Sequence, residues 1–262
     1  MASGDRVGLK SFLILAGSFA FAFLMGEMIH ELGHFLAHRC FGTQTAAIHI
    51  DPFGASRIYG VQALPLQQMG LTTAAGPAFN LILGCLTTLL LWRWTSPNLL
   101  PFILWGPVAL VQEGVNLSLG LLSPGSDARW LVQWGSPAWL LVALGVMFIL
   151  LAIGLFSWIL AARVIFLGRS FGKRFTLIFF GMAFLMILRA FVALFRSPAA
   201  AVENLVPLGF AALLAAIVAS LVGWLDQRRQ SARLGPDTLP WGNSLFAVGM
   251  GLGLLLIQIT LP

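Results

Sequence analysis

The chain has 262 residues, of which 59% are hydrophobic and only 9% are charged. Soluble domains carry about 25% charged residues, so this sequence has too little polar surface to cover a water-exposed globule. The 15 basic residues outnumber the 9 acidic ones, but they are scattered at the ends of apolar runs, which argues against nucleic acid as a partner. The composition predicts an integral, multi-pass protein of the cell membrane that is surrounded by the lipid bilayer.

Several apolar runs are long enough for transmembrane helices, which need about 20 residues to cross roughly 30 Å of hydrocarbon. We expect an all-α polytopic membrane protein with about six to seven transmembrane helices, the exact number depending on whether one run is re-entrant. The predicted spans are Phe12–Ala37, Leu71–Trp92, Leu99–Leu122, Trp139–Leu160, Phe175–Phe195, Leu208–Leu225 and Leu245–Leu261.

The segment between the first two spans, residues 41–70, is too polar and too rich in glycine and proline for a helix. Apolar and polar residues alternate over Ala47–Asp51, and Arg57–Val61 is short and partly β-branched. This pattern predicts a small β-hairpin from Ile48 to Val61 that turns around Pro52-Phe53-Gly54.

An H-E-x-x-H motif, His30-Glu31-Leu32-Gly33-His34, lies within the first predicted span. Four-residue spacing places both imidazoles on one face of a helix, about 6 Å apart along its axis, so both can bind one zinc ion at roughly 2.0–2.1 Å. Glu31, next to the first ligand, can then act as the general base. His38 lies about 12 Å further along the helix than His30, too far to share an ion with it.

A catalytic zinc site takes a third protein ligand and leaves one position open for water or substrate. The remaining candidates are His49, Asp51, Glu113 and Asp127. The first and third predicted spans end on the same side of the membrane, so Asp127 returns to the level of the histidines if Pro124-Gly125 turns the chain inward. Glu113 lies deeper in the third span, and spacing alone leaves both carboxylates as candidates.

Three segments together resemble the site-2 protease family of intramembrane zinc metalloproteases. They are Glu27–His34 on the first span, Ala75–Asn80 on the second, and Asn116-Leu117 leading to Ser126–Arg129 after the third, within residues 20–131. The resemblance implies a zinc metalloendopeptidase that hydrolyses a peptide bond in or near a transmembrane segment of a membrane-protein substrate. It also implies that Zn²⁺ is held by His30, His34 and Asp127, with Glu31 catalytic and with Asn80 and Asn116 close to the site.

Asn80 or Asn116 could hydrogen-bond the backbone of a bound substrate, or either could simply tie membrane helices together. A helical substrate must unwind before attack because its amides are hydrogen-bonded within the helix. The edges of the predicted hairpin could pair with the unwound strand, or the hairpin could be a structural cap on the site.

Charge balance constrains the other acidic groups. Zn²⁺ with ionised Asp127 and Glu31 sums to zero, so Glu27 or Glu113, if buried nearby, must be protonated or hydrogen-bonded, for example to Gln112 or Asn116.

The chain divides into a predicted metalloprotease core, residues 1–135, and additional transmembrane helices without a ligand set, residues 136–262. Arg189 is alone in the fifth predicted span, and we expect it to pair with a carboxylate or a lipid headgroup. Gly249, Gly251 and Gly253 predict close packing of the last helix.

Two other functions are compatible with this sequence. One is a polytopic transporter or channel whose His/Glu cluster moves protons or ions, and the other is a zinc-dependent protein that binds membrane helices without cleaving them. Ten basic residues fall on the side of the N-terminus and four on the other side, which favours an inner N-terminus and a site near the outer face. The family resemblance implies a site nearer the cytoplasm.

Overall fold

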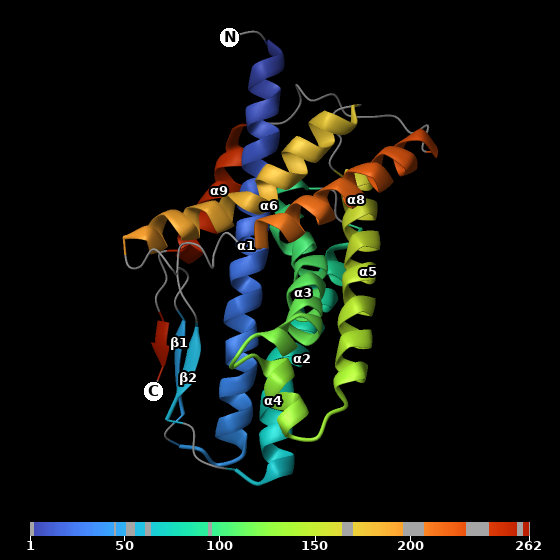
Figure 1. Cartoon of the computed structure of the whole chain (residues 1–262). Coiled ribbons are helices and arrows are strands. Elements are labelled where there is room, and N and C mark those ends of the chain that lie inside the picture. Colours follow the sequence, from blue (N-terminus) through green and yellow to red (C-terminus); the bar gives the residue numbers. More distant parts are fainter. Residues whose placement is uncertain are drawn as a thin grey trace.

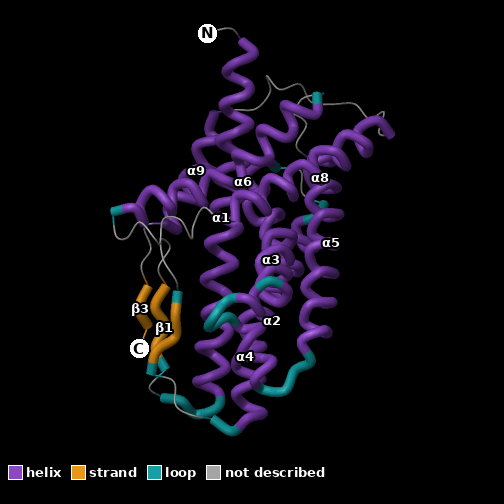
Figure 2. Tube along the Cα trace, in the orientation of Figure 1, coloured by secondary structure: helices purple, strands orange, loops and turns teal. Residues whose placement is uncertain are grey.

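The computed structural model describes residues 3–44, 46–50, 56–60, 64–93, 96–163, 170–195, 207–228, 241–255 and 259–261. Nearly all of them are helical, and one small sheet lies beside the first helix (Figure 1 and Figure 2). Two 3-10 turns, Pro97–Leu99 and Gly120–Leu122, flank the third helix. The helices are α1 (Ser3–Cys40), α2 (Leu66–Leu91), α3 (Leu100–Ser118), α4 (Asp127–Gln133), α5 (Ala138–Arg163), α6 (Phe171–Leu194), α8 (Pro207–Arg228) and α9 (Trp241–Leu255); the strands are β1 (Ala47–Ile50), β2 (Arg57–Tyr59) and β3 (Ile259–Leu261).

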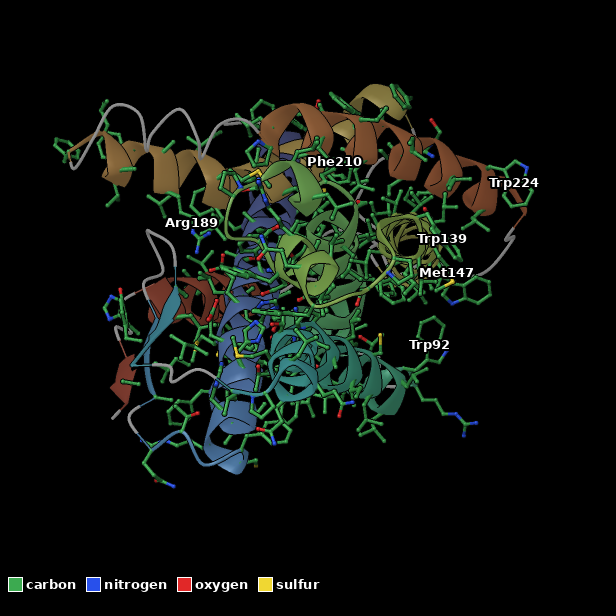
Figure 3. The ribbon with its side chains drawn as sticks, turned by 60° about the horizontal axis from the view of Figure 1, so that its bottom comes forward. Trp92, Trp139, Met147, Arg189, Phe210 and Trp224 are labelled. Atoms are coloured by element: carbon green, nitrogen blue, oxygen red, sulfur yellow. The ribbon has the colours of Figure 1, made fainter. Side chains whose placement is uncertain are left out.

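Five of the described helices, α1, α2, α5, α6 and α8, are long and apolar enough to cross a membrane. Their outer faces carry large apolar side chains, such as Leu89 at 68% exposure and Trp139 at 72%. Trp92 and Trp224 also lie at the periphery of the molecule (Figure 3). A soluble monomer rarely exposes so much contiguous apolar surface, whereas a bilayer solvates it. The prediction of an all-α polytopic membrane protein is confirmed.

The central helix is α3, which contacts α1, α2 and α5 and is buried over most of its length. Pro107 lies inside it and cannot donate to the carbonyl of Ile103, four residues earlier. Thr88 of α2 replaces this bond, because its hydroxyl donates to Ile103 O at 2.9 Å and accepts from Gly106 N at 3.0 Å. A neighbouring helix thus satisfies the backbone carbonyl that the proline leaves unpaired in an apolar interior.

The helices after residue 135 pack directly on those before it. α5 packs on α3, while α6 and α9 pack on α1 (Figure 1). At the α1–α9 contact a Cβ on Gly17 would lie 2.4 Å from the backbone of Ala247, and one on Gly251 would lie 3.0 Å from Gly17 O. The predicted packing role is therefore confirmed for Gly251, but it is wrong for Gly249 and Gly253, which have nothing within 4 Å of the Cβ position.

The sheet confirms the predicted hairpin and adds a third strand. β1 pairs antiparallel with β2, and His49 lies opposite Arg57. The predicted turn around Pro52-Phe53-Gly54 lies outside the described residues. β3, close to the C-terminus, pairs antiparallel with the other edge of β1. The prediction of a span over Leu245–Leu261 is wrong, because α9 covers only 15 residues and Ile259–Leu261 is a strand. The short segment Ile259–Leu261 contains two β-branched residues and lies along the edge of β1 that β2 does not occupy. Pairing there satisfies the backbone N–H and C=O groups of this segment.

Replacing Gly17 with alanine tests the close approach of α1 and α9. Alanine normally favours a helix over glycine by about 1 kcal/mol, but at Gly17 its methyl group would overlap the backbone of α9. We expect Gly17→Ala to lower the free energy of unfolding by about 1–3 kcal/mol. A lower thermal unfolding temperature in detergent would show this loss. Gly249→Ala, on the open face of α9, is the matched control, and an equal response of the two variants would contradict the packing described.

Candidate metal centre

Three potential metal ligands converge at the N-terminal end of α4. His30 and His34 lie one turn apart on α1, and Asp127 is the first residue of α4. His30 Nε2 lies 2.9 Å from Asp127 Oδ2, His34 Nε2 lies 3.3 Å from Asp127 Oδ1, and the two Nε2 atoms are 3.1 Å apart. The three side chains are 12–17% exposed. The structure thus brings together the three residues that the family resemblance implies as ligands.

The turn before α4 delivers Asp127 to the histidines. Gly125 has φ +80°, a left-handed conformation that glycine adopts without steric cost. Ser126 then caps α4, since its hydroxyl donates to Gly120 O at 2.5 Å and accepts from Arg129 N at 3.4 Å. The inward turn expected at Pro124-Gly125 is therefore present, and it reverses the chain after α3.

The Nδ1 atom of each imidazole faces away from Asp127 and is held by a hydrogen-bond partner. His34 Nδ1 donates to Thr72 O at 2.7 Å, in the turn of α2 just before Pro77. His30 Nδ1 donates to the Glu113 carboxylate at 2.9 Å. A carbonyl or carboxylate oxygen only accepts, so the proton of each neutral ring is on Nδ1 and the lone pair is on Nε2.

This donor set fits a divalent cation. Two Nε2 lone pairs and a carboxylate face one another within 4.8 Å, with no donor between them when the rings are neutral. A tetrahedral ion with bonds of about 2.0–2.1 Å holds its ligand atoms about 3.3 Å apart, close to the 2.9–3.3 Å separations here. A carboxylate binds a metal in its ionised form, and a cation between Asp127 and the two lone pairs favours that form.

Glu113 lies behind His30 rather than opposite it. Its side chain is 2% exposed, and Oε1 accepts from Asn80 Nδ2 at 2.6 Å as well as from His30. Asn80 in turn accepts from Trp105 Nε1 at 3.1 Å. Of the two carboxylates that spacing left open, the structure places Asp127 against both Nε2 atoms and Glu113 against the far nitrogen of His30. This position is typical of an outer-shell carboxylate that orients a metal-binding histidine.

Asn80 and Asn116 both lie at the site, as the resemblance implies, and both hold other polar side chains. The Asn116 amide donates to Asp127 Oδ2 at 2.7 Å and to Glu113 Oε2 at 3.5 Å. The amide of Asn80 is engaged by Glu113, and its carbonyl by Trp105. A direct hydrogen bond from either asparagine to a substrate stays a prediction.

The additional acidic groups near the histidines are compensated, as charge balance requires. Glu113 accepts hydrogen bonds from three side chains, Asn116 among them. Glu27, one turn before Glu31 on α1, forms a bidentate ion pair with Arg189 of α6, with Arg189 Nη1 at 2.9 Å from Glu27 Oε1. The prediction that Arg189 pairs with a carboxylate is confirmed.

Gly76 of α2 faces His34, a contact that the sequence does not reveal. A Cβ on Gly76 would lie 2.3 Å from His34 Nε2, the nitrogen that faces Asp127. Only glycine at this position lets the imidazole occupy its observed place. This gives a physical role to the glycine in Ala75–Asn80.

The other candidate ligands lie outside the group. His38 is buried further along α1, and His49 lies on β1, with its ring 6.4 Å from that of Tyr59. Asp51 is outside the described residues. Among the described residues, His30, His34 and Asp127 form the only group of three such side chains close enough to share an ion.

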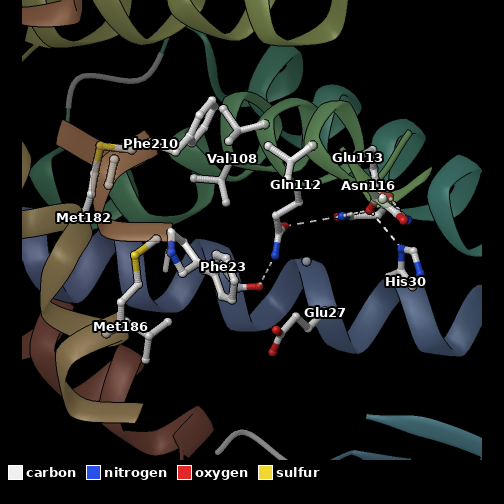
Figure 4. A pocket seen from close by; sticks show the side chains of 18 of the residues that line it. Phe23, Glu27, His30, Val108, Gln112, Glu113, Asn116, Met182, Met186 and Phe210 are labelled. Atoms are coloured by element: carbon white, nitrogen blue, oxygen red, sulfur yellow. Dashed lines mark hydrogen bonds and ion pairs between the residues drawn. The ribbon is translucent and has the colours of Figure 1, made fainter. Parts of the chain in front are cut away.

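A cavity of about 820 Å³ adjoins His30 and Glu31. His30, Glu113 and Asn116 lie at one end of it, and Met182, Met186 and Phe210 lie at the other (Figure 4).

Comparisons of the chain with protein-family models, with curated proteins and with solved structures found no match. The chemistry of the site is therefore argued from its own donor atoms and geometry.

Removing the carboxylate behind His30 tests its role in orienting that ring. Outer-shell partners of this kind typically contribute 10–100-fold to metal affinity. We expect Glu113→Ala to weaken zinc binding by about that factor in a chelator competition, and Glu113→Gln, whose amide oxygen still accepts from His30, to weaken it less. Thr88→Val removes another polar link between α2 and α3 and should leave the affinity within about twofold. Equal losses in all three variants would show a general packing effect.

Gly76→Ala should displace the His34 ring, because the new methyl group would overlap it. We expect zinc affinity to fall at least about tenfold while the helical circular-dichroism signal is kept. Gly154→Ala on α5, where nothing lies within 4 Å of the Cβ position, controls for the change in helix propensity. Unchanged zinc affinity in Gly76→Ala would contradict a ligand role for His34.

Proposed function

We propose that this protein is an intramembrane zinc metalloprotease of the site-2 protease type, located in the cell membrane. It hydrolyses a peptide bond in or near a transmembrane segment of another membrane protein. The observation that carries the proposal is the convergence of His30 Nε2, His34 Nε2 and Asp127 within bonding range of one cation, with Glu31 next to the first histidine. This group belongs to a protein whose helices are apolar enough to cross a membrane.

Zinc is the metal that suits this donor set best. Two imidazoles and one carboxylate are typical ligands of catalytic zinc, with a fourth position left open. Magnesium and calcium prefer sites made entirely of oxygen ligands. When bound, zinc would supply Lewis-acid polarisation of the scissile carbonyl and would lower the pKa of a coordinated water.

The residues of the chain supply the proton transfer and the alignment. Glu31 lines the cavity beside His30, where its carboxylate can take a proton from the attacking water and pass it to the leaving amine. Glu113 and the Thr72 carbonyl keep the Nε2 atoms of the two histidines directed at Asp127. Asn116 holds the Asp127 carboxylate from the other side. Fixed positions of this kind avoid reorganisation during the reaction.

The sheet restricts where a substrate strand could pair. β1 is the central strand, with both edges occupied by β2 and β3. The outer edges of β2 and β3 remain for strand addition. The β2 edge is the one next to the site, because Ser56, just before β2, lines the cavity that contains Glu31. An unwound substrate that paired with β2 would have its backbone hydrogen bonds satisfied next to the proposed base.

Glu31→Gln separates the proposed protease from a transporter or a non-cleaving binder of membrane helices. The amide keeps the shape of the side chain but cannot accept the proton. We expect zinc content to stay at one ion per chain, while cleavage of transmembrane peptides in proteoliposomes falls by at least about 10²-fold.

His34→Ala should lose both zinc and cleavage, and Cys40→Ser, at the exposed end of α1, should keep both. A zinc-loaded wild-type protein that cleaves no membrane peptide would contradict the proposal. A Glu31→Gln variant with altered ion flux would favour a transporter.

A further inference from the structure

Helices from the second half of the chain line the cavity away from the metal centre. Met182 and Met186 of α6 and Phe210 of α8 lie at this end, opposite Phe23 of α1 and Val108 of α3 (Figure 4). These side chains are apolar, whereas the end at His30 carries amides and carboxylates. A single molecule in the cavity would therefore meet a polar, reactive end and an apolar end.

The size of the cavity restricts its occupant. At about 820 Å³, it falls within the range of roughly 300–1,000 Å³ that is typical of pockets for drug-sized ligands. A short stretch of extended peptide is of that size, whereas a whole membrane-spanning helix has about 20 residues and is much larger.

We propose that the apolar end of this cavity is a subsite for the side chains of a short, unwound, apolar stretch of the substrate. The subsite rests on the proposed protease function, and it gives the helices after residue 135 a role in substrate selection. Met182, Met186 and Phe210 contact the bound side chains and set the size that is accepted. Methionine suits this role because its thioether side chain is flexible and polarisable.

The ion pair between Glu27 and Arg189 fixes the position of this subsite. Arg189 follows Met186 by about one turn on α6, and Glu27 precedes Glu31 by one turn on α1. The guanidinium also lies over the ring of Phe23, 5.2 Å from its centroid. The side chains that select the substrate are thus tied to the helix that carries the proposed base.

A peptide fits the lining better than a lipid acyl chain. An acyl chain reaching His30 would place the Glu31 carboxyl group against hydrocarbon, where a polar group costs free energy unless it is hydrogen-bonded. The amides of an unwound peptide supply such partners, while its side chains occupy the apolar end. The two-ended lining therefore points to a peptide.

Tripeptide hydroxamates test the subsite by binding rather than by cleavage. The hydroxamate binds the metal, and an extended tripeptide reaches about 10 Å from it. Ala, Leu, Phe and Trp are placed in turn at each of the three positions. Affinities for zinc-loaded, full-length protein in detergent are measured by thermal shift.

The variants enlarge or narrow the apolar end. We expect Met186→Ala to raise the ratio of Trp to Ala affinity at one position by at least about tenfold, and Met186→Trp to lower it by a similar factor. Ile187→Ala and Ile187→Trp change the next residue of α6, which is 45% exposed and does not line the cavity. They should leave every ratio unchanged.

The outcomes separate this inference from the proposed function. The subsite would be overturned if both Met186 variants left the ratio of Trp to Ala affinity unchanged, or if they changed the affinity of every hydroxamate by the same factor. Either result would leave the protease proposal standing. Release of a co-purified lipid by Met186→Trp, seen by native mass spectrometry with unchanged ratios, would identify an acyl-chain site. Shifted ratios in a zinc-loaded protein that cleaves nothing would support the subsite and overturn the protease. Absence of zinc binding would overturn both.

Discussion

The candidate site depends on one arrangement, the meeting of two imidazoles from α1 with the carboxylate of Asp127 at the start of α4. Three acceptor groups in a partly buried place repel one another unless a cation or a proton lies between them, so the arrangement requires a positive charge. Each imidazole is held from behind, His34 by a backbone carbonyl and His30 by a carboxylate. The protein thus fixes the direction of both lone pairs before any ion is bound.

The polar groups around this arrangement are satisfied by one another, which makes them tolerable inside an apolar bundle. Asn80, Glu113 and Trp105 form a buried chain of hydrogen bonds that ends at His30. Thr88 compensates in a similar way for the proline in α3. Because an unpaired polar group in such a place costs several kcal/mol, this network also fixes how α1, α2 and α3 pack.

The second half of the chain is structurally continuous with the first. α5 packs on α3, α9 packs on α1 through Gly17 and Gly251, and α6 is joined to α1 by the Glu27–Arg189 ion pair. These contacts place apolar side chains of α6 and α8 in the cavity that begins at His30. The helices that carry no ligand therefore shape the space in which a bound molecule would lie.

The sequence by itself determined the features that depend on local spacing: the apolar helices, the hairpin, the shared face of His30 and His34, and the turn before Asp127. Helical periodicity and turn chemistry act over a few residues, so they can be read along the chain. Spacing left both Glu113 and Asp127 as candidates, and only the packing of α3 against α1 placed Glu113 behind His30. The fit of Gly76 against His34, the third strand near the C-terminus and the partner of Arg189 were likewise decided by tertiary structure, because each joins segments whose distance in space no local pattern records.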